Sequence, residues 1–142
     1  ETALTAKTRA VIINSPNNPT GRVYGEEELA GLARVLAGKD ILLISDEPYR
    51  KIVFDGAQVP SIFKIFPESV VITSYSKDLS LAGERIGHIA VSPRMTDREA
   101  FTAALIMANR ILGFVNAPAL MQRVIEKVQG ESVDVSAYQR RR

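Results

Sequence analysis

Near its centre the chain reads Val70-Val71-Ile72-Thr73-Ser74-Tyr75-Ser76-Lys77, an apolar run that ends in hydroxyl groups and an amine. Residues 41–45, Ile-Leu-Leu-Ile-Ser, are equally apolar and are followed by Asp46. Strands that are apolar on both faces are typical of a sheet with helices on both sides. We therefore expect both runs to be buried strands whose polar ends lie at the edge of a sheet.

The segments on either side alternate between strand and helix patterns. Residues 9–14 are a β-branched run that ends at Ser15-Pro16, a turn signal. Residues 26–37 place leucines on one face and carboxylates in the first turn, which predicts a helix closed by Gly38. We also expect a strand at 86–92, helices at 97–112 and 118–129, and a short helix within 54–68. This order predicts a three-layer α/β/α fold with a mainly parallel sheet.

The composition excludes several classes of function. Of the 142 residues, 46% are hydrophobic and 24% are charged, as in ordinary globular proteins. A net charge of +2 does not favour nucleic acid. The chain has no cysteine, and its single histidine, His88, is interpreted as structural. No apolar run approaches the ~20 residues of a membrane span. We therefore expect no metal, no nucleic acid and no membrane partner.

Reactive side chains gather at the ends of the predicted strands. Ligands of open α/β sheets bind beyond the carboxyl ends of the strands, and Asn18, Asp46 and Lys77 each lie at or past such an end. Tyr49 lies in the loop that follows residues 41–45, and Arg85 lies in the loop that follows residues 70–74. A guanidinium binds phosphate oxygens, and a partly buried amine beside another cation can attack an aldehyde. The set predicts a site for a phosphorylated aromatic aldehyde.

Four short motifs carry a family resemblance. They are Asn17-Asn18-Pro19-Thr20-Gly21, Asp46-Glu47-Pro48-Tyr49, Ser74-Tyr75-Ser76-Lys77 and Gly83-Glu84-Arg85-Ile86-Gly87. In this order and with these spacings the chain resembles the fold-type I pyridoxal phosphate (PLP) enzymes, specifically the class I/II aminotransferases. The resemblance runs from about residue 9 to about residue 92.

The resemblance implies a role for each polar residue of the motifs. Lys77 would be the catalytic lysine that holds PLP as a Schiff base. Asp46 would pair with the pyridinium nitrogen and so keep the ring an electron acceptor. Tyr49 and Asn18 would lie at the cofactor's 3′-oxygen, with Asn18 also near the substrate carboxylate. The phosphate would be held by three further side chains, those of Ser74, Ser76 and Arg85.

Other parts of the family's site have no counterpart in this sequence. These are an upstream phosphate loop, an aromatic that stacks on the pyridine ring, and a downstream arginine that binds the substrate's α-carboxylate. We therefore expect residues 1–142 to be the central segment of the PLP-binding large domain, without the N-terminal segment or the C-terminal small domain. We also expect this chain alone to be inactive.

The resemblance implies an enzyme of amino-acid metabolism and biosynthesis. It would transfer an amino group between an amino acid and a 2-oxo acid, and the full-length protein would be a cytoplasmic homodimer. The same motifs also serve C–S lyases and other fold-type I lyases. A non-catalytic, PLP-sensing domain of a regulator is a further alternative. A P-loop nucleotide binder is disfavoured, because the sequence has no Gly-x-x-x-x-Gly-Lys-Ser/Thr loop.

Overall fold

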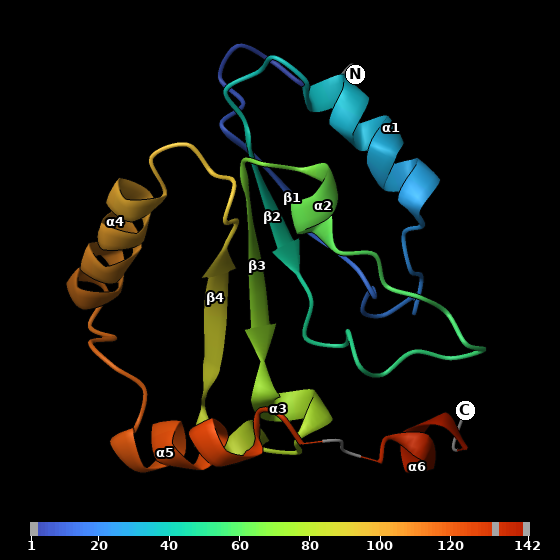
Figure 1. Ribbon diagram of the computed structural model, residues 1–142, viewed down its shortest axis with the longest axis vertical. Helices are drawn as coiled ribbons and strands as arrows, with labels where there is room; N and C mark the ends of the chain where they lie inside the picture. Colours follow the sequence, from blue (N-terminus) through green and yellow to red (C-terminus); the bar gives the residue numbers. More distant parts are fainter. Residues whose placement is uncertain (1–2, 132–133, 141–142) are drawn as a thin grey trace.

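A computed structural model describes residues 3–131 and 134–140. Within this part of the chain one sheet contains the strands β1 (Ala10–Asn14), β2 (Leu42–Asp46), β3 (Ser69–Ser74) and β4 (Gly87–Val91) in that spatial order. The first three strands are parallel, and β4 runs antiparallel to β3 (Figure 1). The predicted α/β fold with a mainly parallel sheet is confirmed.

The connections explain the strand directions. The β1–β2 connection contains α1 (Glu26–Leu36), and the β2–β3 connection contains α2 (Ile62–Ile65), so each can cross the sheet and start a parallel strand. The β3–β4 connection contains only short turns, α3 (Tyr75–Asp78) and a 3₁₀ turn at Ala82–Glu84. The chain therefore turns back beside β3. A β-carbon at Gly87 would lie 2.4 Å from the Thr73 carbonyl oxygen, so this close return requires glycine.

Helix α1 forms where the sequence pattern predicts it. Its first turn contains Glu26, Glu27 and Glu28, which suit the positive end of the helix dipole. The Glu28 carboxylate accepts a hydrogen bond from the Gly25 N–H at 3.0 Å. This bond and a further one from Arg22 lower the pKa of Glu28. After the helix the chain turns at Gly38, whose φ is +70°.

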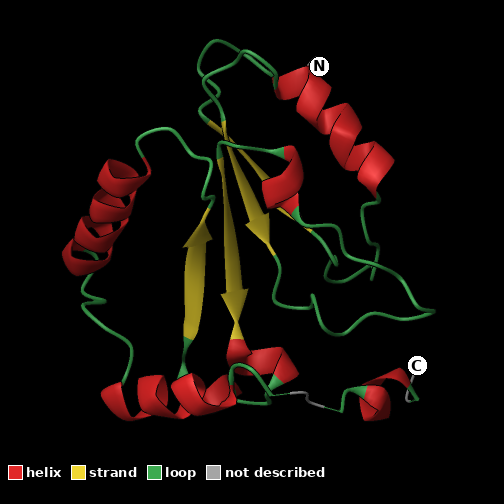
Figure 2. Ribbon diagram, in the orientation of Figure 1, coloured by secondary structure: helices red, strands yellow, loops and turns green. Residues whose placement is uncertain are grey.

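The larger part of the core covers one face of the sheet. Leu29 and Leu36 of α1, Ile62 of α2 and Phe66 just after α2 surround Leu43 of β2, whose side chain is completely buried. A smaller cluster joins α3 to α5 (Ala119–Val128) below the carboxyl end of β3 (Figure 2). This second cluster supports the turn that contains Lys77.

The opposite face of the sheet is only partly covered in the described residues. Ile12 is 71% exposed there, and Ile72 and Ile89 are exposed as well. Helix α4 (Arg98–Ile111) stands beside the sheet in Figure 1 and buries none of its residues. We expected β2 to be covered on both sides, but packed helices cover only one side here. Met107 of α4 remains exposed, as does Phe114 in the loop beyond this helix.

The remaining elements include two short helices that the sequence pattern did not predict. These are α3, which contains the lysine of interest, and α6 (Ser136–Gln139). Within the described residues, no helix has both the length and the apolar character needed to cross a membrane.

Candidate functional site

The carboxyl ends of the three parallel strands bring the site loops together. Asn14, the last residue of β1, lies opposite Asp46, the last residue of β2, and Asp46 lies opposite Ile72 of β3. The loops that follow β1 and β2 and the turn α3 that follows β3 therefore meet at one edge of the sheet (Figure 1). This agrees with the expected position of a ligand in an open α/β sheet.

These loops surround a cavity of about 540 Å³. Its wall comes from the Asn-Pro loop after β1, the turn after β2, helix α3 and the C-terminal α6. The lining residues are Pro16, Asn17, Asn18, Pro19, Gly21, Tyr49, Ile52, Phe54, Ser76, Lys77 and Tyr138. The volume lies within the usual range for small-molecule and cofactor sites. Four of the predicted site residues share this cavity: Asn18, Tyr49, Ser76 and Lys77.

Tyr49 is the centre of the polar contacts in this cavity. The Asn18 side-chain N–H donates a hydrogen bond to the Tyr49 hydroxyl at 3.1 Å. The Lys77 Nζ atom lies 5.7 Å from the centre of the Tyr49 ring, within the range of a cation–π contact. Lys77 itself is exposed, so its amine is accessible from the cavity.

Asp46 is connected to the cavity through a residue that the sequence analysis missed. The Asn14 side-chain N–H donates to the Asp46 carboxylate at 3.2 Å and to its carbonyl oxygen at 3.0 Å. The Asn14 side-chain oxygen accepts from the Asn18 backbone N–H at 2.8 Å and from the Asn17 side chain at 3.2 Å. Asn14 thus fixes Asp46 relative to Asn18. The available signal was a polar residue ending an apolar strand.

Ser74 and Ser76 form the start of α3. The Ser74 hydroxyl oxygen caps the helix by accepting from the Ser76 N–H at 3.1 Å, and it donates to the Ser76 hydroxyl at 2.8 Å. Ser74 is therefore the end of β3 and the cap of a helical turn at once. Ser74 does not itself line the cavity, but its hydroxyl contacts that of Ser76, which does.

Arg85, like Asp46 and Ser74, is a predicted site residue that does not line the cavity. Its side chain donates to the Ala82 carbonyl at 2.9 Å and faces a separate hollow on the α4 side of the sheet. Its backbone lies near the site, because the neighbouring Ile86 carbonyl accepts from the Tyr75 N–H at 3.2 Å. Arg85 also has a φ of +51°, which non-glycine residues rarely adopt.

Glu47 is a second residue whose position the sequence did not indicate. It directly follows Asp46 in the sequence, and its side chain is buried. Its carboxylate accepts a hydrogen bond from the Ser45 hydroxyl at 2.8 Å. Arg50 donates to its other oxygen at 2.7 Å and also to the carbonyls of Val59 and Pro60. This network ties the start of the Tyr49 turn to the loop that leads into α2.

His88 lies on β4, with its ring centre 5.5 Å from that of Tyr75. Burial lowers the pKa of His88, and the Asp78 carboxylate opposes this shift. Burial also raises the pKa of Tyr75. In the described part of the chain no group of three or more His, Cys, Asp or Glu side chains is placed to hold a metal ion.

Comparison with known proteins gives a consistent result. A family model described as aminotransferase class I and II matches residues 1–141. The chain is 48% identical over 92 residues to an aspartate aminotransferase of Bacillus sp. (strain YM-2), a match that covers 62% of this chain and 24% of the relative.

Solved structures are similar over more of the chain. An aminotransferase from Eubacterium rectale is 46% identical with a TM-score of 0.91, over 98% of this chain and 36% of that one. Thermus thermophilus aspartate aminotransferase, in a single-mutant form, is 34% identical with a TM-score of 0.64, over 77% of this chain and 27% of that one. The chain thus spans about a quarter to about a third of the length of these proteins.

Proposed function

The chain belongs to the class I and II aminotransferases. We propose that it is part of an enzyme that transfers an amino group between an amino acid and a 2-oxo acid. The cofactor would be pyridoxal phosphate. The observation that carries this proposal is the cavity at the carboxyl ends of the parallel strands, where the Lys77 amine lies over the Tyr49 ring and Tyr49 binds Asn18. The aminotransferase names of the similar proteins support it.

The side chains that line the cavity, together with Asp46, which Asn14 connects to the cavity, fit this cofactor. An accessible amine, Lys77, can bond to an aldehyde carbon. Asp46 can accept from a protonated ring nitrogen, and its orientation is fixed by Asn14. The Asn18 amide and the Tyr49 hydroxyl can bind a ring oxygen. Bound PLP supplies a ring that withdraws electrons from the amino acid's Cα.

The phosphate group would be held beside α3. The Ser76 hydroxyl lines the cavity, and Ser74 supports it through the bond between the two hydroxyls. Arg85 is proposed as the third phosphate contact. Its side chain would need to leave the Ala82 carbonyl and turn toward Ser74, near which its backbone already lies.

Lys77 would also move protons in this reaction. An amine that is not bonded to the cofactor can take the proton from the amino acid's Cα and deliver that proton to another atom, provided that the amine remains within hydrogen-bond reach. The Tyr49 ring next to the Nζ atom limits where the Lys77 side chain can swing. Tyr49 is thus proposed both to bind the cofactor and to guide the lysine.

We further propose that residues 1–142 form the central segment of the PLP-binding large domain of a cytoplasmic homodimer. The chain's span of about a third of the Eubacterium rectale structure supports the first part. The exposed apolar side chains of α4 and the following loop, which include Met107 and Phe114, are suited to contact further protein.

The proposal is tested by trapping the cofactor. The chain is incubated with PLP, reduced with borohydride and digested, and the pyridoxyl group is located by mass spectrometry. We expect it on Lys77 in preference to the exposed Lys39 and Lys64. The matched control, Lys77→Arg, should lose the preferred adduct. An even distribution over the exposed lysines would refute the assignment of this cavity.

A further inference from the structure

We propose that the ion pair between Lys51 and Asp78 is a positioning device that holds the Tyr49 ring against the Lys77 amine. Lys51 follows Tyr49 by two residues, and Asp78 directly follows Lys77. The Lys51 Nζ atom lies 2.9 Å from the Asp78 Oδ2 atom. This inference rests on the proposed function, because that function is what gives the Tyr49–Lys77 geometry a purpose.

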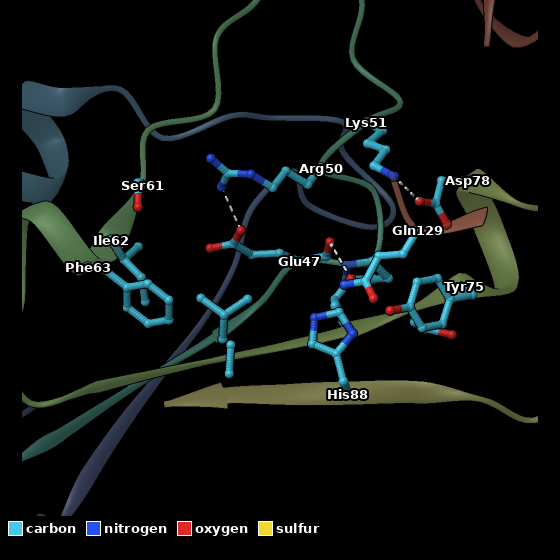
Figure 3. A pocket seen from close by; sticks show the side chains of 15 residues that line it. Glu47, Arg50, Lys51, Ser61, Ile62, Phe63, Tyr75, Asp78, His88 and Gln129 are labelled. Carbon is cyan, nitrogen blue, oxygen red and sulfur yellow. Dashed lines mark hydrogen bonds and ion pairs between the residues drawn. The ribbon is translucent and has the colours of Figure 1, made fainter. Parts of the chain in front are cut away.

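The ion pair lies outside the site that it supports. Tyr49 and Lys77 line the cavity of about 540 Å³, whereas Lys51 and Asp78 line a neighbouring cavity of about 360 Å³. Figure 3 shows this second cavity, with the Lys51–Asp78 contact drawn beside Tyr75. The turn after β2 and helix α3 therefore each contribute to the reaction site, through Tyr49 and Lys77, and also contribute one residue each to the ion pair. Lys51 and Asp78 are positioning residues and do not touch the proposed cofactor cavity.

The burial of Asp78 makes this pair different from a surface ion pair. The Asp78 side chain is 11% exposed and that of Lys51 is 52% exposed, whereas the side chains of the Arg9–Asp40 pair are 76% and 88% exposed. Within the described residues, the second carboxylate oxygen of Asp78, Oδ1, is buried without a hydrogen-bond partner. A buried carboxylate that loses its cation is left uncompensated, so the arrangement in which Lys51 contacts Asp78 is favoured.

The pair adds a tie where the sheet no longer holds the turn. Behind the site, the Glu47 N–H donates to the Ile72 carbonyl at 2.8 Å and the Thr73 hydroxyl donates to the Glu47 carbonyl at 3.3 Å. Both bonds join the start of the turn to β3. The Lys51–Asp78 pair lies beyond the end of β3 and joins the far part of the turn to α3. Together the ties fix the turn on both sides of Tyr49.

The test measures the reactivity of Lys77 without any cofactor. The chain is labelled with a trace of an amine-reactive anhydride, and labelling of Lys77 is compared with labelling of the exposed Lys64 in the same sample. The variants are Lys51→Met, Asp78→Asn and the double variant, with Lys51→Arg as the rescue. The control is Asp40→Asn, which removes the exposed pair with Arg9.

We expect both single variants to raise the Lys77 labelling ratio by about threefold or more, a coupling at the low end for residues in contact. The double variant should add nothing, Lys51→Arg should restore the original ratio, and Asp40→Asn should leave it unchanged. A pure charge effect is distinguishable, because Lys51→Met removes a cation near Lys77 and Asp78→Asn removes an anion. Charge alone would then move the ratio in opposite directions.

The inference is overturned if the folded single variants keep the original labelling ratio or move it in opposite directions. It is also overturned if the effects of the two substitutions on the ratio add in the double variant. If Asp78→Asn does not fold, as circular dichroism would report, Lys51→Met at the exposed end and its Lys51→Arg rescue decide the result. The borohydride adduct on wild-type Lys77 is scored separately. Absence of that adduct would refute the proposed function, while the labelling ratios would still report the positioning.

Discussion

Replacing Asn14 by alanine should disconnect Asp46 from the cavity and destabilise the fold. Asn14 makes four hydrogen bonds, two to Asp46, one to the Asn18 backbone and one to the Asn17 side chain. Each is worth about 0.5–1.5 kcal/mol net, so we expect Asn14→Ala to lower the free energy of unfolding by about 3 kcal/mol. With a urea dependence of about 2 kcal/mol per molar, the urea midpoint should fall by about 1.5 M.

Two further variants separate the causes. Asn116→Ala removes an exposed asparagine elsewhere and should leave the urea midpoint almost unchanged. Asn14→Asp keeps an acceptor for the Asn18 N–H but places a second carboxylate beside Asp46, so its stability should recover as the pH falls toward about 4 and the repulsion is relieved. A midpoint for Asn14→Ala that matches Asn116→Ala would refute the bridging role of Asn14.

Three other outcomes follow from the structure. Leu43→Ala, at a completely buried site between β2 and α1, should cost about 3 kcal/mol of unfolding free energy, and a loss below about 1 kcal/mol would contradict the packing described. Burial lowers the pKa of His88 below its ordinary 6.5, so the unfolded chain binds more protons there and stability should decline as the pH falls below 6.5. The urea midpoint measured against pH should show this decline, and His88→Gln should flatten it. In the full-length protein, Asp46→Ala should slow removal of the Cα proton far more than it weakens amino-acid binding, and an unchanged single-turnover rate would exclude the proposed pairing with the cofactor ring.

The regular elements could be predicted because hydrophobic spacing determines them. The run at 41–45 became β2 at Leu42–Asp46, and the amphipathic pattern at 26–37 became α1 at Glu26–Leu36. Helix α3 could not be predicted in the same way. It is a single turn of four residues, too short to show a period, and it depends on the Ser74 hydroxyl capping the Ser76 N–H.

The direction of β4 and the position of Arg85 depend on contacts that spacing does not reveal. The chain returns beside β3 because Gly87 can approach the Thr73 carbonyl closely. The same return turns Arg85 toward the Ala82 carbonyl, and Arg85 lines a different hollow from Lys77. The motif around Arg85 thus indicated where its backbone lies and did not indicate where its side chain points. Its proposed phosphate contact remains a prediction.

At two of the four motifs, residues next to each other in the sequence are associated with different cavities, and this explains why the motifs reveal only part of the site. Asp46 is connected to the cofactor cavity through Asn14, while the next residue, Glu47, lines the neighbouring cavity and binds Arg50. Lys77 lines the cofactor cavity, while Asp78 lines the neighbouring one and binds Lys51.

Side chains of the first kind have chemistry that a sequence pattern can indicate. Those of the second kind, Glu47 and Asp78, are ordinary carboxylates until burial and a paired cation make them structural supports. Since a site must hold its groups within about 0.5 Å of the productive geometry, the second set is as necessary as the first. Variation at Lys51 or Asp78 should therefore alter the reactivity of Lys77 without touching the cofactor cavity.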